Sequence, residues 1–318
     1  MLHVRVICPS DTTEAALAAL RAEPGATLIT VQRGAAVEPA GDVLAADVAR
    51  ESVNDVVAAL EALGISRDGG IVLGPIDTTL SESADRAVAE APGDPSDAVV
   101  WQALLAETRD ESTLSPAFLA FITIACLLAA VGVATDSPVT IVGAMVVGPE
   151  FGPLAALAVS LVRKDFALAR RSALALVVGF AVAMVITWVA TLVWEQFGWL
   201  TLDSVDRIHN VEFIYQVGPF SLVVALLAGA AGMLSLVTSK SAALVGVFIS
   251  VTTIPAAGFA VVAATVGEWS KAFESIGQLG VNMVGIVIAG WIVLQLRPRH
   301  GSEGGPLDRL KRWWISAG

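Results

Sequence analysis

Long apolar stretches follow one another from Ser112 almost to the C-terminus, and this feature restricts the fold more than any other. Each stretch supplies the roughly 20 apolar residues that a helix needs to cross a bilayer. The stretches cover residues 116–135, 138–162, 172–194, 218–237, 242–266 and 277–296. A mean hydropathy of +0.74 is also typical of a membrane protein. We therefore predict a polytopic helical membrane protein with six spans, and we expect the lipid bilayer as its main partner.

The second stretch is interrupted by a glutamate, in the sequence VVGPEFGP. Pro149 and Pro153 lack backbone N–H groups, and Gly148 and Gly152 allow the chain to depart from a helix. Non-helical backbone at membrane depth must be buried in protein or line water. We predict a broken span here, with Glu150 binding a cation, carrying a proton or closing a salt bridge. The alternative is structural, in which Glu150 caps the broken helix or bonds a neighbouring subunit.

The two halves of the membrane region resemble each other. When ATDSPVTIVGAMVVGPEFGPLAAL is compared with LVTSKSAALVGVFISVTTIPAAGF, Gly143 aligns with Gly246 and Pro153 meets Pro255 after a slip of one residue. Three spans per half would make the halves inverted relative to the bilayer, and matching interrupted segments mark the binding region of many transporters. We therefore predict a 3+3 inverted repeat and a second break in the fifth span.

Several polar residues of the membrane region join the list of candidates. Thr252 and Thr253 precede Pro255, so they either bond to freed carbonyls or line a polar site beside Glu150. Asn282 lies inside the sixth span, where it either links helices or contacts a substrate. Asp136 and Ser137 precede Pro138, a pattern typical of a helix cap at the start of the second span.

Residues 1–80 predict a separate α+β domain. Alternating segments and helical segments follow one another in the order strand, helix, strand, strand, helix, strand, which is the ferredoxin-like pattern. It predicts one antiparallel sheet of four strands with both helices on one face. This fold hosts assembly as well as ligand-sensing roles, so both remain open.

Residues 81–112 are predicted to form a polar linker followed by an amphipathic helix. The six spans and their connections fill residues 113–297, and residues 298–318 form a basic tail. Residues 1–112 hold seven Arg and Lys against nineteen Asp and Glu, so the acidic charge belongs to the N-terminal part. An acidic surface argues against binding to nucleic acid.

Basic residues of the connections indicate the orientation in the membrane. Arg163, Lys164, Arg170 and Arg171 lie between spans 2 and 3, and further basic residues follow span 6. The connections on the opposite side hold only Arg207 and Lys271. The positive-inside rule then places the N- and C-termini in the cytoplasm of a prokaryotic cell, with the spans in its inner or plasma membrane.

Enzyme signatures such as H-E-x-x-H, G-x-S-x-G and the P-loop are missing from the sequence. We expect a protein that is not an enzyme, with no catalytic residue, metal or cofactor. The primary hypothesis is a transporter or channel-like permease for an unknown small solute or ion, assembled as a homo-oligomer. The alternative is a non-transporting sensor or scaffold whose soluble domain binds a ligand or partner.

The segment around Glu150 resembles a known family. Asp136-Ser137-Pro138, Gly143-Ala144-Met145, Pro149 and Gly152-Pro153 match the signature of the domain of unknown function 389 family, uncharacterised multi-span proteins of bacteria and archaea. The resemblance covers nearly the whole chain and implies a fold, but no substrate or reaction. Many members carry an apolar residue where this chain has Glu150, so the resemblance implies a role for Glu150 in a subfamily only.

Overall fold

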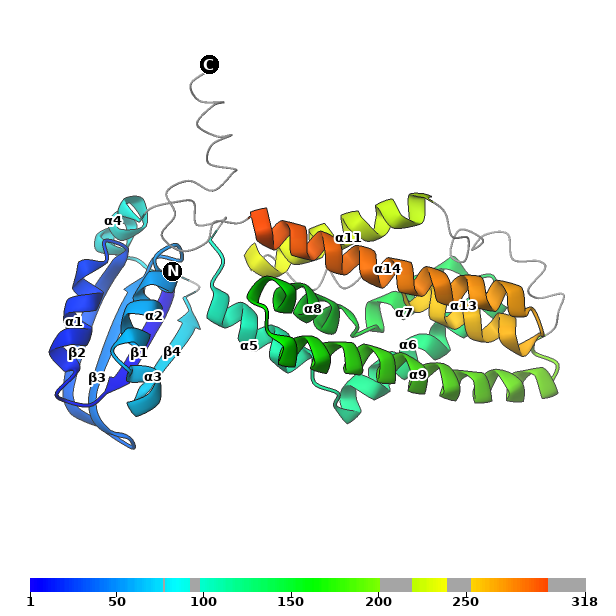
Figure 1. Ribbon diagram of the computed structural model, residues 1–318, viewed down its shortest axis with the longest axis horizontal. Helices are drawn as coiled ribbons and strands as arrows, with labels where there is room; N and C mark the ends of the chain where they lie inside the picture. Colours follow the sequence, from blue (N-terminus) through cyan, green and yellow to red (C-terminus); the bar gives the residue numbers. More distant parts are fainter. Residues whose placement is uncertain (77, 92–97, 201–218, 239–252, 297–318) are drawn as a thin grey trace, which may run out of the picture. The chain divides into compact units, whose positions relative to one another are not determined.

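The structure is a computed structural model that describes the chain except residues 77, 92–97, 201–218, 239–252 and 297–318 (Figure 1). The described chain divides into two compact units, Met1–Leu104 and Leu105–Gln295. Each unit has hydrophobic clusters of its own. Each is therefore described separately.

The N-terminal unit contains the predicted four-stranded antiparallel sheet. Its elements are β1 (Leu2–Cys8), α1 (Thr13–Ala22), β2 (Ala26–Val37), β3 (Ala40–Val48), α2 (Val53–Ala62), α3 (Ile65–Asp68) and β4 (Gly70–Pro75). The strands lie in the order β2-β3-β1-β4, and every neighbouring pair is antiparallel. The short helix α3 is an element that the sequence pattern did not predict.

One face of this sheet is buried because the strands alternate between apolar and polar residues. In β1 the buried positions are every second residue, from Leu2 to Cys8, and β3 buries Leu44, Ala46 and Val48 in the same way. The register pairs Val4 with Ala46, so the two buried rows lie side by side. Apolar residues of α1 and α2 complete this cluster, so the two helices cover the buried face.

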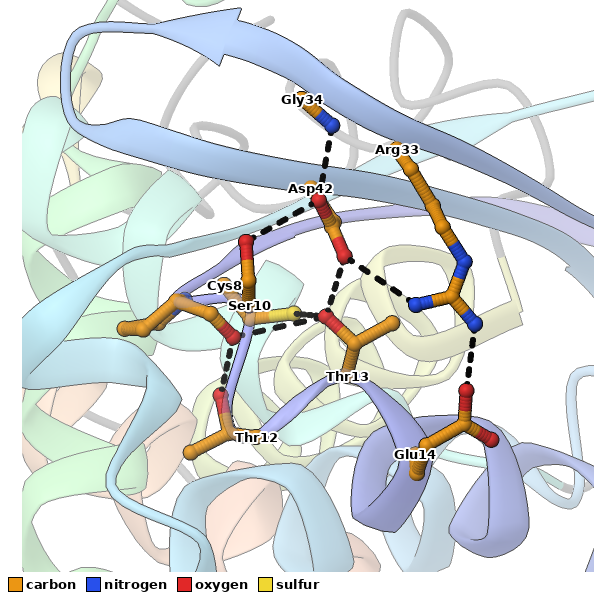
Figure 2. Close-up of polar contacts among 9 residues, drawn as sticks. Cys8, Ser10, Thr12, Thr13, Glu14, Arg33, Gly34 and Asp42 are labelled. Atoms are coloured by element: carbon orange, nitrogen blue, oxygen red, sulfur yellow. Dashed lines mark hydrogen bonds and ion pairs between the residues drawn. The ribbon is translucent and has the colours of Figure 1, made fainter.

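A buried carboxylate joins the β2–β3 hairpin to the turn between β1 and α1 (Figure 2). Asp42 is 1% exposed and accepts hydrogen bonds from Gly34 N at 2.7 Å, Thr13 Oγ1 at 2.8 Å and Ser10 Oγ at 3.2 Å. The guanidinium of Arg33 lies 3.9 Å away. A carboxylate needs such donors when it leaves water, which explains why Asp42 is tolerated in the core.

The region predicted as a polar linker contains a helix. Helix α4 (Glu82–Glu90) begins at Ser81, whose hydroxyl accepts a hydrogen bond from Ala84 N. Ala84 and Ala87 are buried, so a small apolar face on this acidic segment explains why it is helical. The predicted amphipathic helix follows as α5 (Trp101–Glu111).

The second unit is helical throughout its described part. Its helices after α5 are α6 (Pro116–Ala134), α7 (Pro138–Val147), α8 (Phe151–Arg163), α9 (Phe166–Gln196), α11 (Pro219–Thr238), α13 (Ile254–Thr265) and α14 (Trp269–Leu296). Helices α6, α9, α11 and α14 are long and apolar enough to cross a membrane. Helices α7 and α8 meet the same criterion only as a pair, which is bent by 54°.

The described residues therefore contain four or five candidate spans, where the sequence predicted six. The difference lies in the fifth predicted span, of which α13 is the second part, with 12 residues. Residues 239–252, which the sequence assigned to the first part of that span, lie outside the described residues. The basic tail predicted for residues 298–318 lies outside them as well.

The long helices and the short ones differ in what surrounds them. The long helices expose many large apolar side chains, such as Phe121 of α6 and Val177 of α9, as expected for helices that face lipid. In contrast, the residues of α13 from Ile254 to Ala263 are all buried, and so are most residues of α8. Helices α8 and α13 are therefore enclosed by the rest of the unit, whereas the long helices and α7 expose apolar side chains.

Small residues let these helices approach closely. A Cβ added to Gly229 of α11 would lie 2.6 Å from the Ile286 carbonyl oxygen of α14, and one added to Gly258 of α13 would lie 2.6 Å from Ala129 Cβ of α6. Gly229 lies at the contact between α11 and α14. In the structure it packs within the chain, because α11 and α14 are neighbours there.

We predict that Asp42→Asn loosens the β2–β3 hairpin. The hydrogen bonds, led by that of Gly34 N, lower the pKa of Asp42, so its stabilising effect is complete above the usual aspartate pKa of about 4. This effect is lost as the pH falls through the lowered pKa of the folded state. Amide exchange of residues 30–42, measured by mass spectrometry at neutral pH, should be faster in the variant.

The matched control is Asp47→Asn, which removes a carboxylate of the same strand that pairs with the exposed His3. Such exposed pairs stabilise little, so exchange in the hairpin should stay unchanged. In thermal unfolding, the natural chain should lose its advantage over Asp42→Asn below about pH 4. An advantage that persists in acid would contradict this role of the carboxylate.

Candidate functional site

The break between α7 and α8 is the predicted interruption of the second span. Helix α7 ends at Val147, Gly148 has an extended conformation (φ −64°, ψ 126°), and α8 begins after Glu150. Pro149 lies between them and has no N–H group to continue the helix. Pro153 falls in the first turn of α8, where a missing N–H is tolerated.

Helix α13 begins in the same manner. Its N-cap is Thr253, and Pro255 is its second residue, again within the first turn. The Thr253 carbonyl accepts the first helical hydrogen bond, from Ala257 N at 3.1 Å, as the Glu150 carbonyl does from Leu154 N at 3.2 Å. Two helices that begin inside the unit therefore share a capping position followed by a proline.

One hydrogen bond between side chains joins these two helix starts. Thr253 Oγ1 donates to Glu150 Oε1 at 2.6 Å, and both residues are fully buried. Neither side chain caps its own helix. The N-termini of α8 and α13 therefore meet at the Glu150 carboxylate, and the partial positive charge of a helix N-terminus attracts a negative group. In Figure 1, α8 lies towards the left of this unit and α13 towards its right.

Among the described residues of this unit, Glu150 is the one charged residue whose side chain is buried. The Cys126 thiol of α6 is also fully buried and lies within electrostatic range of the Glu150 carboxylate. Cys126 and Cys8 are buried free thiols that do not pair with each other. A single carboxylate in an apolar interior is costly unless it has a function or a partner.

A second carboxylate approaches α8 from α5, and the sequence gave no sign of it. A Cβ added to Gly152 would lie 2.4 Å from Glu111 Cβ and 2.7 Å from Glu111 Oε2. Gly152 is thus required so that α5 can lie against the first turn of α8. Partial withdrawal from water, together with the charge of Glu107, raises the pKa of Glu111.

Helix α14 carries a buried polar row. Ser275, Gln278 and Asn282 are spaced as one face of a helix and are each at most 3% exposed. Ser275 Oγ donates to the Ala256 carbonyl of α13 at 2.8 Å. Gln278 Nε2 donates to Ser221 Oγ of α11 at 2.6 Å, and Ser221 Oγ donates to Asn282 Oδ1 at 3.0 Å. Of these three residues, Asn282 was the predicted site residue, and the spacing of the row adds Ser275 and Gln278.

The structure therefore brings Gly148, Pro149, Glu150, Gly152 and Pro153 together with Thr253 and Pro255, while Asn282 bonds to α11. Thr252 lies outside the described residues. The N-cap of α7 is Ser137, whose hydroxyl accepts from Thr140 N at 3.3 Å, whereas Asp136 precedes the cap with a φ of 44°. Asp136 therefore does not take the capping position that the sequence suggested for it.

No group of three or more His, Cys, Asp or Glu side chains that could hold a metal ion occurs in the described part of the chain. Carbonyl and hydroxyl oxygens are the other ligands that proteins offer to hard cations. At the break, the last carbonyls of α7 have no helical partner, because the helix ends there.

Comparison with known proteins identifies the region that contains this site. The model of the family described as "Domain of unknown function (DUF389)" matches residues 145–288, just under half of the chain. This segment is a DUF389 domain. The family predicted from the sequence is thereby confirmed, and the domain includes Glu150, Thr253, Gln278 and Asn282.

A curated relative is an uncharacterized protein of the archaeon Methanocaldococcus jannaschii, 24% identical over 187 residues. The match covers 58% of this chain and 55% of the relative, so the chain spans about half the length of the curated relative that it matches. No solved structure matches the chain. The apolar helices of the DUF389 domain are compatible with a membrane protein, and its name assigns no activity.

We predict that Gly152→Ala destabilises the protein by about 1–3 kcal/mol, because the added methyl group collides with Glu111 Cβ and forces α5 or α8 to move. Thermal unfolding of the purified full chain in detergent measures this change.

The control is Gly143→Ala in α7, where nothing lies within 4 Å of the added Cβ. Alanine favours a helix over glycine by roughly 0.5–1 kcal/mol, so this variant should be neutral or slightly stabilised. Equal behaviour of the two variants would contradict the close packing of α5 on α8.

Proposed function

We propose that the protein is a membrane permease for a small solute or ion, with its binding site at Glu150. The observation that supports this proposal is the Glu150 carboxylate, which is fully buried at the break between α7 and α8. It is hydrogen-bonded to the N-cap of α13. Ionisable groups at membrane depth are costly, and they generally mark ion or substrate pathways. In this proposal the protein is a transporter and not an enzyme.

The two short helices support an inverted repeat of three plus three spans. Helices α8 and α13 both begin inside the unit, both carry a proline in the first turn, and their caps are bonded to each other. Transporters with such repeats bind substrate where discontinuous helices begin near the midplane. In the proposed topology α13 is the second part of a broken fifth span, which gives six spans in total.

The N-terminal unit is proposed to be a ferredoxin-like domain with an assembly or regulatory role. Its strand order β2-β3-β1-β4 and its element order support this assignment. The basic residues of the α8–α9 connection, Arg163 and Lys164, support a cytoplasmic location for this connection and for both termini in a prokaryotic membrane. We also expect a homo-oligomer.

A flux assay tests the permease directly. The full chain is reconstituted into liposomes that contain a pH-sensitive dye or a sodium-sensitive dye, and proton and sodium gradients are imposed in turn. We predict flux above that of empty liposomes, and its loss in Glu150→Gln, which keeps the shape of the side chain but removes its charge.

The matched control for this assay is Thr187→Val. Thr187 is fully buried in α9, and its hydroxyl has no hydrogen-bond partner among the described residues. The variant therefore removes a polar atom from the same unit and should retain flux. Flux that is equal in Glu150→Gln and in the natural chain would exclude Glu150 as the site.

The second candidate is a membrane-anchored sensor or scaffold without transport. It is favoured by the N-terminal unit, which has its own core and a sheet whose second face exposes polar residues such as His3 and Arg5. In that case the membrane unit would stay closed to water.

Cys126 separates the two candidates, because this buried thiol interacts electrostatically with the Glu150 carboxylate and the chain has only two cysteines. In a Cys8→Ser variant, a permease that opens should let a small water-soluble thiosulfonate modify Cys126, as measured by mass spectrometry. A scaffold should leave Cys126 unmodified until the protein unfolds. The absence of modification in a flux-competent sample would contradict a pathway past Glu150.

A further inference from the structure

One exposed face of α9 carries a cation followed by apolar side chains. Arg170, Leu174 and Val177 are separated by four and three residues, which places them on one face of the helix. Arg170 is exposed, and Leu174 and Val177 are 51% and 68% exposed. Phe166, one turn before Arg170, belongs to the same face and is 85% exposed. This face is therefore open from the start of α9 into its apolar part.

Lys164 adds a second cation just before α9. It is the C-cap of α8 and has a left-handed backbone (φ 56°), which turns the chain between the two helices. Lys164 and Arg170 are both exposed, and in the described part of the chain their side chains form no ion pair or hydrogen bond. Since α9 rises only about 6 Å from Phe166 to Arg170, both long side chains can reach one anionic group.

The acidic residue between these cations is already paired. The carboxylate of Asp165 accepts two backbone N–H groups at the start of α9, at 3.0 and 3.1 Å, and a hydrogen bond from Arg109 Nη2 at 3.3 Å. Glu111 lies at the first turn of α8, about 18 Å along this helix from Lys164, where salt screens its charge. The charges of Lys164 and Arg170 are therefore left for a partner outside the chain.

The length of α9 indicates the depth of these side chains in a bilayer. Its 31 residues extend about 46 Å, whereas the hydrocarbon core is about 30 Å thick and the headgroup layers bring this to about 40–45 Å. Residues 172–194 hold no charged side chain, so they fill the core. Arg170 then lies among the headgroups, and Leu174 and Val177 lie among the acyl chains.

We propose that Lys164 and Arg170 bind the headgroup of an anionic phospholipid, whose acyl chain lies along Leu174 and Val177. Basic side chains at this depth attract anionic lipids, and an exposed aromatic ring such as that of Phe166 is favoured at the same interface. A free anion such as phosphate would use the two cations but not the apolar face beside them. The combination therefore favours a lipid.

This inference goes beyond the proposed permease, because it requires only that the chain lies in a membrane. The test uses the purified full chain, freed of lipid in a neutral detergent, and follows thermal unfolding by tryptophan fluorescence. Dioctanoyl phosphatidylglycerol, dioctanoyl phosphatidylcholine and glycerol 3-phosphate are added in turn, so that headgroup charge and acyl chains are varied separately.

A ligand that binds only the folded state raises the unfolding midpoint with its concentration. We expect a saturable rise with phosphatidylglycerol, and no saturable rise with phosphatidylcholine or with glycerol 3-phosphate. Added salt should weaken the response to phosphatidylglycerol, because it screens the two cations.

The variant for this test is Lys164→Asn with Arg170→Gln, in which asparagine suits the left-handed backbone of position 164. It should weaken the apparent affinity for phosphatidylglycerol by about tenfold or more, since each basic residue near a membrane surface contributes to the attraction. If this variant does not fold, Arg170→Gln alone replaces it, with a loss of about fivefold.

The matched control is Arg21→Gln with Arg86→Gln, which removes two exposed cations from α1 and α4 and should keep the natural affinity. The proposal is overturned if phosphatidylcholine or glycerol 3-phosphate acts as well as phosphatidylglycerol, or if the variant at positions 164 and 170 keeps the natural affinity. Glu150→Gln, the variant expected to lose flux, should keep the response to phosphatidylglycerol. A response that disappears in Glu150→Gln would contradict the assignment to Lys164 and Arg170.

Discussion

The structure of the second unit depends on how the backbone groups are satisfied where the chain stops being helical inside an apolar interior. Backbone groups left open by such a break are costly in lipid, so the break must be enclosed by protein. Here the two short helices α8 and α13 are buried, and the four long helices present apolar side chains to the outside. The arrangement follows from this constraint, and it gives the centre of the unit its polar character.

The bond between Glu150 and Thr253 links the break to the rest of the unit. It connects the caps of two helices whose bonded residues are 103 positions apart in the sequence. Ser275 of α14 donates to the Ala256 carbonyl in the first turn of α13. Polar contacts are therefore concentrated at the helix starts, while apolar packing fills the remainder of the unit.

Sequence patterns predicted the elements whose signal is local. The antiparallel sheet followed from alternation in β1 and β3, and the break at Pro149 and Glu150 followed from residues that cannot continue a helix. Contacts between residues far apart in the sequence were harder to predict, because they depend on which helices become neighbours. Glu111 meets Gly152 only through the packing of α5, and Asp42 becomes buried only when the hairpin closes on the turn before α1. Helix α4 was missed because its apolar face consists of two alanines in an acidic segment.

The contact between α8 and α13 joins side chains and not backbones. Thr253 Oγ1 donates to Glu150 Oε1, while the first backbone hydrogen bond of each helix is made within that helix. The backbone of both helices therefore stays satisfied whether or not this side-chain contact is made. Loss of the Glu150 carboxylate would leave the Thr253 hydroxyl, and not a helix end, without its partner.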